Sequence, residues 1–444
     1  MKRRFITGIC CSVLLLASCN KNEAPIGSQN DLPSSLNAQG EPYSPQIFIG
    51  KGADAEFSRF ANKLPGFGGM YIDPDGTPVI YVKNPGRDAR LLQELHGQVQ
   101  RISAHRERTK GNKPVKKQPQ NYVLKKANYD YRDLASAKIK LRDLLSDSRL
   151  TGIDIREDLN MVELLVRSEA DIPGVQEAAK RLSLPDRMIH VTTRPPQQYT
   201  RTLRDRANPN YPLVGGLQTA GNLTCTMGFN ATIEKDGVSK YGMITASHCS
   251  DNSIGVVTGT RFVQPLNYGF YDTIGYETVD PATFPCAKSA KCRYSDSIFI
   301  EYQPNLITNP SALAAPTSLS NSSSFNLNIY EDSFYFIQTA GEIEYYGDTL
   351  YKIGRTSGMQ AGTITRTCVD STPVDGVVYL CQMEANAYNA EGDSGGPVFS
   401  VNRDNTINLL GLTSGRPGII PSLIYHPWYQ IADDFYREGY GLYF

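Results

Sequence analysis

The sequence has no excess of either charge. Lys and Arg together number 45, as do Asp and Glu, so the formal net charge at pH 7 is zero. A protein that binds nucleic acid usually carries a clear basic excess, which neutralises phosphates. We therefore expect no nucleic-acid partner, and we interpret the basic stretch from Arg101 to Lys126 as a solvated loop or linker rather than a patch for nucleic acid or an anionic surface.

The apolar run near the N-terminus is too short for a mature membrane-spanning helix. It covers residues 5–17, whereas a bilayer requires about 20 residues. Basic residues 2–4 precede it and small residues follow, which is typical of a secretory signal. The tetrapeptide Leu-Ala-Ser-Cys that ends at Cys19 resembles the lipobox of bacterial lipoproteins, in which the cysteine is acylated. We expect an exported lipoprotein with a signal peptide at residues 1–19 and a lipid on Cys19; the alternative is an ordinary signal peptide.

Among the nine cysteines no CxxC pair occurs, which disfavours a zinc site. Cys10 and Cys11 lie within the signal, and six other cysteines lie in the C-terminal half. An even number in an exported protein indicates disulfides, although the sequence alone leaves their connectivity open. These six are Cys225, Cys249, Cys286, Cys292, Cys368 and Cys381. We expect neither a metal nor an organic cofactor.

The length of 444 residues favours two folded units. Residues 20–45 are rich in Asn, Ser, Pro and Gly and are interpreted as a flexible tether. Residues 46–195 are predicted to form a small α+β unit, and the polar residues 196–212 an exposed connector suited to proteolytic processing. The elements expected in the α+β unit are a hairpin over Met70–Val82, a helix near Leu134–Leu145, a hairpin over Ile153–Val166, a helix over Ile172–Leu184 and a strand over Met188–Val191.

From residue 213 to residue 444 the pattern is that of an all-β domain. Short β-branched and aromatic runs alternate with Gly, Asn, Ser and Pro, whereas clear helical periodicity is scarce before Trp428–Glu438. This pattern predicts a β-sandwich or barrel that ends in a helix.

The heptapeptide Glu-Gly-Asp-Ser-Gly-Gly-Pro around Ser394 is the sharpest feature of the chain. A serine hydroxyl becomes an effective nucleophile when a base removes its proton, and its attack creates an oxyanion that requires donors fixed in advance. Glycines permit a tight turn, so the amides of Gly392 and Ser394 can point into one cavity. The motif predicts Ser394 as the nucleophile and Gly392 and Ser394 as the oxyanion hole, rather than a merely polar turn.

Histidine is scarce beyond residue 200, where only His248 and His426 occur. His248 follows a strand-like run and precedes Cys249, through which a disulfide could hold it in place. His426 stands before Pro427 at the entry to the predicted final helix, where we expect a surface or capping role. We therefore predict that His248 is the base.

A base that gains a proton needs an acceptor that sets its tautomer and stabilises the imidazolium. Asp296 lies in Tyr-Ser-Asp-Ser-Ile-Phe-Ile, at the start of an apolar strand, where its side chain can be buried. Asp272 and Asp280 are rivals whose surroundings suggest loop. We predict that Asp296 completes a triad with His248 and Ser394.

These motifs together resemble the bacterial chymotrypsin-fold serine proteases of the streptogrisin and α-lytic protease type. The resemblance spans about Val214 to Phe444 and rests on Cys225–Asn230, Thr245–Cys249, Gly354–Gly358, Gly362–Ile364, the serine motif and Gly411–Gly415, in the order of the family. It implies two six-stranded antiparallel barrels with the triad in the cleft between them. It also implies endopeptidase activity through an acyl-enzyme and a disulfide between Cys225 and Cys249.

The sequence departs from that family at a second disulfide. Tyr351 and Ala361 stand where the family often has two half-cystines, so that bridge is missing. Cys368 and Cys381 are candidates for a different bridge nearby, and a bond between Cys286 and Cys292 would close a small loop.

The resemblance also places the primary specificity pocket. Its floor is expected near Tyr388 and Asn389, and one wall at Thr413, Ser414, Gly415 and Arg416. Arg416 stands where these enzymes usually have glycine; its guanidinium would narrow the pocket, attract an acidic side chain or extend into solvent. The cleavage specificity stays open.

The α+β unit resembles, in size and position, the pro-regions that assist folding of these enzymes and inhibit them. Leu213-Val-Gly-Gly216 resembles their mature start. Because a fold of non-local β pairings forms slowly, a folding aid has a physical rationale. We expect cleavage between about Arg206 and Leu213, after which the lipid anchor stays with the pro-region and the protease can leave the membrane.

The sequence therefore predicts an exported serine endopeptidase, made as a pro-enzyme in the cell envelope at the outer membrane or cell surface. Its expected partners are protein or peptide substrates and its own pro-region. The alternative is a catalytically silent envelope protein that uses the same fold to bind a peptide or glycan. An α/β-hydrolase esterase is disfavoured because its residues follow the order Ser, Asp, His.

Overall fold

The computed structural model describes residues 52–85, 97, 122–194 and 212–444, apart from 252, 265–271, 288–289, 317–318, 320–328, 373–375, 403 and 416–421. The predicted signal peptide, Cys19, the tether and nearly all of the connector lie outside these residues. Within them, no helix is long and apolar enough to cross a membrane.

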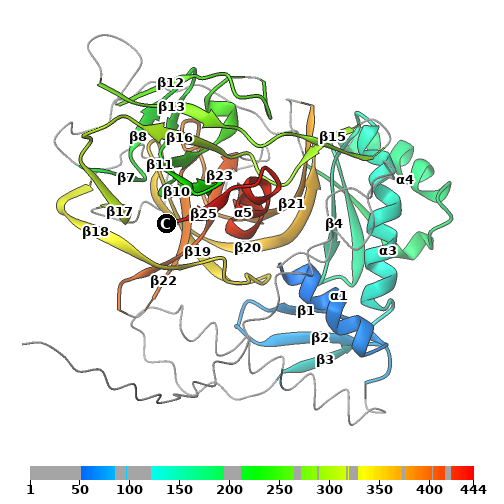
Figure 1. Ribbon diagram of the computed structural model, residues 1–444. Coiled ribbons are helices and arrows are strands. Elements are labelled where there is room, and N and C mark those ends of the chain that lie inside the picture. The colour runs from blue at the N-terminus through cyan, green and yellow to red at the C-terminus, as the bar shows by residue number, and fades with distance from the viewer. Residues whose placement is uncertain are drawn as a thin grey trace, which may run out of the picture.

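The N-terminal part contains helices on small sheets, as the periodicity predicts (Figure 1). Its elements are α1 (Ala53–Lys63), β1 (Phe67–Ile72), β2 (Pro78–Val82), β3 (Val123–Lys126), α3 (Tyr131–Leu141), β4 (Leu150–Arg156), β5 (Met161–Val166), α4 (Ile172–Lys180) and β6 (Ile189–Thr193). Both expected hairpins are present, since β1 pairs with β2 and β4 with β5 in antiparallel fashion. Asp130 begins α3 by accepting a hydrogen bond from the amide of Arg132, as an N-cap residue does.

The remainder is β-rich, and its first sheet has eight strands in the order β25-β10-β11-β16-β13-β12-β8-β9. These strands are β8 (Gln218–Ala220), β9 (Thr224–Thr226), β10 (Phe229–Lys235), β11 (Val238–Thr245), β12 (Arg261–Gln264), β13 (Asp272–Val279), β16 (Ile298–Tyr302) and β25 (Gly441–Tyr443). All of its pairings are antiparallel. Alternating apolar side chains such as Phe229, Ala231 and Ile233 of β10 are buried, which explains the strand pattern.

The second sheet follows the order β14-β15-β21-β24-β23-β22-β19-β20-β4-β5-β6. Its strands beyond the N-terminal part are β14 (Phe284–Ala287), β15 (Ala290–Arg293), β19 (Thr349–Gly354), β20 (Gly358–Ser371), β21 (Val377–Ala385), β22 (Pro397–Val401), β23 (Ile407–Gly415) and β24 (Leu423–Pro427), with β7 (Leu213–Gly215), β17 (Thr308–Pro316) and β18 (Ile329–Ala340) at its side. The helix α5 (Trp428–Arg437) follows β24. The predicted all-β class with a C-terminal helix after a small α+β unit is confirmed; strands from other parts of the chain extend both sheets.

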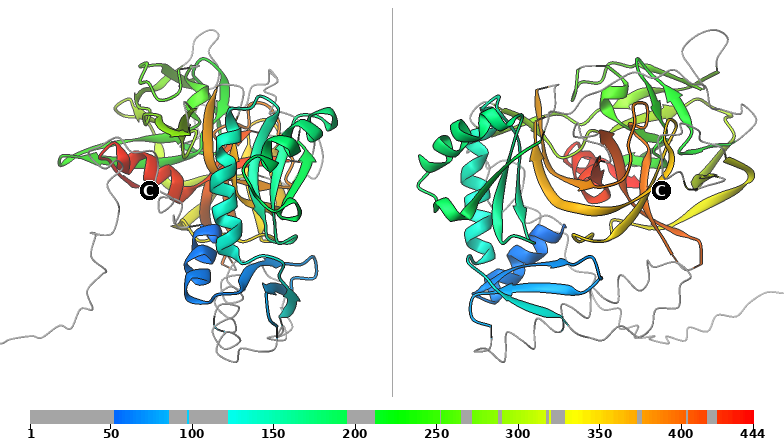
Figure 2. Two further views of the ribbon diagram at one scale, coloured as in Figure 1. Left: turned by 90° about the vertical axis from the view of Figure 1, so that its right-hand side faces the viewer. Right: turned by 180° about the vertical axis from the view of Figure 1, so that it is seen from behind.

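The N-terminal part joins the second sheet directly. β4 pairs with β20 through Ile153 opposite Asp370 and Gly152 opposite Ser371, so β4, β5 and β6 lie beside the long curved strands β20 and β21 (Figure 2). Buried ion pairs cross the same contact: Arg142 Nε lies 2.6 Å from Asp370 Oδ2, and Arg194 Nη2 lies 2.6 Å from Glu384 Oε1. Backbone pairing and buried charges together specify one docking register.

Two carboxyl groups of the N-terminal part are buried without a hydrogen-bond partner. Asp154 and Glu157 are 0% and 1% exposed, and none of their side-chain oxygens has a hydrogen-bond partner, although Lys138 Nζ lies 3.8 Å from Asp154 Oδ1. Burial raises the pKa of both groups well above the ordinary value. The charge of Lys138 opposes this rise appreciably for Asp154 but not for Glu157. An unfolded carboxyl ionises near about pH 4, whereas these two stay protonated to higher pH. The folded state therefore loses stability as the pH rises from about 4 towards the pKa values that Asp154 and Glu157 have in the folded protein.

We therefore expect Glu157→Gln to flatten the decline of the unfolding free energy between pH 5 and pH 8. The comparison is made by urea unfolding of the full chain. Glu169→Gln at an exposed site is the control, since that carboxyl is solvated in both states. An equal pH slope in Glu157→Gln and the parent would show that Glu157 does not carry the effect.

Candidate active site

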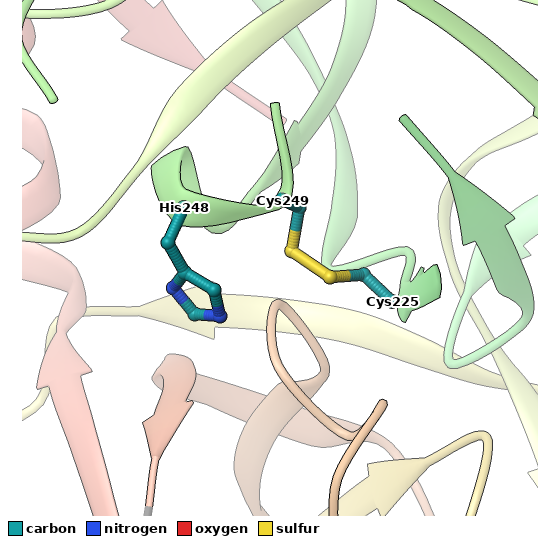
Figure 3. Close-up of side chains that lie close together, drawn as sticks. All are labelled: Cys225, His248 and Cys249. Carbon is teal, nitrogen blue, oxygen red and sulfur yellow. A yellow bond between two sulfur atoms is a disulfide. The ribbon is translucent and has the colours of Figure 1, made fainter. Parts of the chain in front are cut away.

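His248 lies on a single helical turn that follows the end of β11. The turn covers Ser247–Cys249, and Cys249 is bonded to Cys225 of β9, as the resemblance implies. Figure 3 shows the disulfide directly beside the histidine, so the turn is tied to a neighbouring strand. The structure also pairs Cys286 with Cys292 and Cys368 with Cys381.

Asp296 contacts both the ring and the backbone of His248. Its Oδ2 lies 2.5 Å from His248 Nδ1, and its Oδ1 accepts the backbone amide of His248 at 3.0 Å. The aspartate is only 1% exposed. A ring held at Nδ1 in this way presents its other nitrogen, Nε2, for proton transfer.

The charge of Asp296 is well supported despite its burial. Burial acts to raise the pKa of Asp296, but the neighbouring His248, through its charge and its hydrogen bonds, lowers the pKa below its ordinary value. Ser414 Oγ adds a further hydrogen bond to Oδ2 at 3.1 Å. The carboxylate is therefore ionised over the pH range in which a histidine exchanges its proton.

Ser394 lies in the tight turn that the glycines predict. Gly392 and Gly395 both adopt φ of +81°, a region open mainly to glycine. Ser394 Oγ donates to the carbonyl of Ser414 at 3.2 Å, and its own carbonyl accepts the amide of Thr226 at 2.8 Å. Ser414 thus contacts both Ser394 and Asp296, so Ser414 and Asp296 connect Ser394 to His248.

The two predicted oxyanion donors are free of other partners. Within the described part of the chain, the amides of Gly392 and Ser394 donate no hydrogen bond, whereas the amides of Asp393, Gly395 and Gly396 are all paired. The Gly392 carbonyl is turned away, because it accepts Thr226 Oγ1 at 2.7 Å. Such fixed and unpaired amides suit an oxyanion.

A buried lysine that the motif analysis missed lies beneath this turn. Lys352 Nζ contacts Asp393, the residue before Ser394, and also donates to Ser357 Oγ at 2.8 Å and Asn389 Oδ1 at 2.9 Å. Burial lowers the pKa of Lys352, and Asp393 opposes this effect. In the sequence, the feature that could have identified Lys352 is that it is the only charged residue of the strand β19.

Both oxygens of the Asp393 carboxyl group also accept hydrogen bonds from backbone amides. Oδ1 accepts the amides of Thr356 and Ser357 at 2.9 and 3.0 Å, and Oδ2 accepts the amide of Ala390 at 2.8 Å. The aspartate is 0% exposed. Lys352 and these amides hold the serine turn from below.

The predicted pocket residues are brought together, with one exception. Asn389 Nδ2 donates to the Gly415 carbonyl at 2.7 Å, which links the expected floor to the expected wall. Thr413 and Ser414 are buried on β23, and Tyr388 is half-buried. Arg416 lies outside the described residues, so its side chain is not placed.

The surface or capping role predicted for His426 is wrong. This histidine is 0% exposed and belongs to β24, which continues up to the first turn of α5. Its ring lies 5.1 Å from that of Tyr379, and its Nε2 lies 3.4 Å from Gln382 Nε2. Burial lowers the pKa of His426 to about 4, so the ring is neutral at neutral pH.

The rival acids have other positions. Asp272 begins β13 and Asp280 follows the end of β13, so Asp272 belongs to a strand and not to a loop. Asp280 is buried, and it contacts Arg293 and Ser247 but not the ring of His248.

Two groups of described residues have the spacing of metal ligands. They are Cys225, His248 and Cys249, and Cys368, Asp370 and Cys381. In both groups the cysteines are joined in a disulfide, so they offer no thiolate to a metal.

No protein-family model and no curated protein matches this chain. Solved structures similar to it include Thermobifida fusca protease A and a Nocardiopsis protease, each 19% identical with a TM-score of 0.36. The matches cover 52% of this chain and 98% and 100% of those chains. Cellulomonas bogoriensis chymotrypsin is also 19% identical, with a TM-score of 0.35 over 52% of this chain and 98% of that chain.

Proposed function

We propose that this chain is a serine endopeptidase of the chymotrypsin-fold type, with His248, Asp296 and Ser394 as its triad. The observation that carries the proposal is the convergence of the three residues: Asp296 holds His248 at 2.5 Å, and Ser414 contacts both Asp296 and Ser394. A glycine turn with two unpaired amides adjoins this site.

The proposed reaction follows from these positions. Ser394 Oγ attacks the scissile carbonyl carbon while His248 accepts the hydroxyl proton. Asp296 stabilises the imidazolium, and the amides of Gly392 and Ser394 bind the oxyanion. His248 then gives its proton to the leaving amine, and water hydrolyses the acyl-enzyme by the same steps.

The chain is further proposed to be made as a pro-enzyme that is exported and lipidated on Cys19. The N-terminal part would assist folding and inhibit the enzyme until cleavage between about Arg206 and Leu213. The continuous pairing of β4 with β20 and the buried ion pairs at that contact support a specific partnership. Release of the protease from a cell-envelope anchor would follow this cleavage.

The proposed substrates are proteins or peptides bound in the pocket formed by Tyr388, Asn389 and residues 413–416. Asn389 and Gly415 are linked by a hydrogen bond, which fixes the pocket's inner end. The proposal leaves the preferred side chain open.

Labelling with a fluorophosphonate probe tests the proposal. The probe phosphonylates an activated serine and releases fluoride, so we expect labelling of the parent and none of Ser394→Ala. A labelled fragment of the size of residues 213–444 would support removal of the N-terminal part. Failure of folded, processed parent protein to label would reject the protease and favour the silent peptide- or glycan-binding protein.

A further inference from the structure

A fully buried arginine lies directly before the segment that carries Asp296. Arg293 is the last residue of β15 and is 0% exposed. Its Nη1 lies 2.5 Å from Asp280 Oδ1 and 3.4 Å from Ser247 Oγ, and its Nη2 donates to the Ser297 carbonyl. Its Nε lies 3.6 Å from Asp434 Oδ2.

The partners of Arg293 adjoin both His248 and Asp296. Ser247 is the residue before His248, and Ser297 is the residue after Asp296. Asp280 binds the same Ser247 hydroxyl with both oxygens at 3.0 Å, so the guanidinium and the carboxylate hold that hydroxyl together. The planar, rigid guanidinium group of Arg293 thus bonds to the segment of His248 and to the segment of Asp296. The spacing of these two segments sets the contact between His248 and Asp296.

The second carboxylate comes from the C-terminal helix. Asp434 of α5 is 0% exposed, and its Oδ2 accepts the Ser295 amide at 2.7 Å and the Ser295 hydroxyl at 2.8 Å. Ser295 precedes Asp296. Helix α5 therefore also holds the Asp296 segment, through Ser295.

The cluster lies where the two sheets meet. β15 pairs in parallel with β21 of the second sheet, with Arg293 opposite Tyr379, while β16 after Asp296 belongs to the first sheet (Figure 1). The segment from Arg293 to Ser297 crosses between the sheets. A relative displacement of the sheets would separate Asp296 from Ser414 and Ser394, which β23 and its neighbouring turn carry.

We propose that Arg293, with Asp280 and Asp434, is a positioning clamp that fixes the segments of His248 and Asp296 relative to each other and to the second sheet. The proposal rests on the proposed function of the triad and adds three residues that touch no reacting atom. We call Arg293, Asp280 and Asp434 the triad clamp.

The charges of the triad clamp support this role. Burial acts to lower the pKa of Arg293, but Asp280 and Asp434 raise it, so the guanidinium stays charged. Burial raises the pKa of Asp280 and Asp434 even though Arg293 opposes the rise. Buried charges of this kind add little to stability compared with apolar packing, whereas their bonds are directional. Directional bonds suit a device that sets distances.

Arg293→Lys tests the clamp, because lysine keeps the charge beside both carboxylates but cannot hold Ser247 and Ser297 at once. The first readout is the downfield proton resonance of the His248 Nδ1–H bond to Asp296, recorded in the full chain with Ser394→Ala. The second is the rate of fluorophosphonate labelling with Ser394 intact. We expect the resonance to shift or broaden and the labelling rate to fall by on the order of 10²-fold, as misplacement by about 1 Å can cause.

Arg156→Lys is the matched control, because Arg156 forms ion pairs with Asp158 and Glu163 within the β4–β5 hairpin, away from the triad. It should leave the resonance and the labelling rate at the parent values. Arg293→Met serves as a second variant, with a larger loss in both readouts if it folds; if it does not fold, Arg293→Lys alone decides. A parent-like resonance and labelling rate in Arg293→Lys would overturn the clamp.

The two readouts separate the clamp from the proposed function. The resonance requires no turnover, so a parent that shows the resonance but never labels would reject the protease. If Arg293→Lys then lost the resonance while Arg156→Lys kept it, the clamp would still stand as a device that positions His248 against Asp296.

Discussion

Asp296→Asn is expected to lower kcat by about 10⁴-fold with little change in KM. The amide of asparagine would offer an N–H where His248 Nδ1 now faces a carboxylate oxygen at 2.5 Å. It would therefore favour the wrong histidine tautomer and leave the imidazolium without a counter-charge. The backbone amide of His248 could still bond to the asparagine oxygen, so we expect the fold to persist.

Asp272→Asn is the control for this prediction, because Asp272 is a rival acid by sequence. The measurement is turnover of a peptide substrate by the processed enzyme, with circular dichroism to verify folding. Loss of activity in Asp272→Asn with full activity in Asp296→Asn would move the third triad role to Asp272.

Lys352→Met is expected to destabilise the protein by about 3–5 kcal/mol and to abolish most labelling of Ser394. The substitution leaves the Asp393 carboxyl group fully buried with no cation beside it, next to the serine turn. Exposing Asp393 would relieve this cost and would displace Ser394 and the amide of Gly392. Urea unfolding and fluorophosphonate labelling measure the two effects.

The double variant Lys352→Met with Asp393→Asn separates charge from packing. Asparagine keeps oxygens for the amides of Thr356 and Ser357 but needs no counter-charge, so we expect much of the stability to return. Lys352→Met with parent stability, or no recovery in the double variant, would show that the buried ion pair does not support the turn.

Local motifs were the most informative part of the sequence. The heptapeptide around Ser394 lies in a tight glycine turn, as predicted, and His248 lies on a single helical turn after a strand-like run. The helices α3 and α4 followed from periodicity, since each buries one face, whereas β4 and β5 are short runs that are buried along almost their whole length. The helix predicted to reach Leu184 ends at Lys180.

Roles that depend on distant partners were not predictable in this way. The position of His426 next to the final helix predicts exposure, but His426 is buried because β24 pairs with β23. Asp280 resembled a loop acid, and only the approach of Arg293 shows why it is buried. In the sequence, Lys352 is a single charge among mostly apolar residues. Only the tertiary structure shows that Asp393 of the serine turn is its partner.

By itself, the sequence determined the all-β class with its final helix, the elements of the N-terminal part apart from α1 and β3, and the local chemistry around Ser394 and His248, because these depend on periodicity and on neighbours within one turn. Only the tertiary structure decided that Ser414 joins Asp296 to Ser394, that β4 continues the sheet of β20, and that Arg293 lies between Asp280 and Asp434. These contacts join residues far apart along the chain. The free energy of burying a charge depends on which distant partner arrives beside it, and no local pattern records that partner.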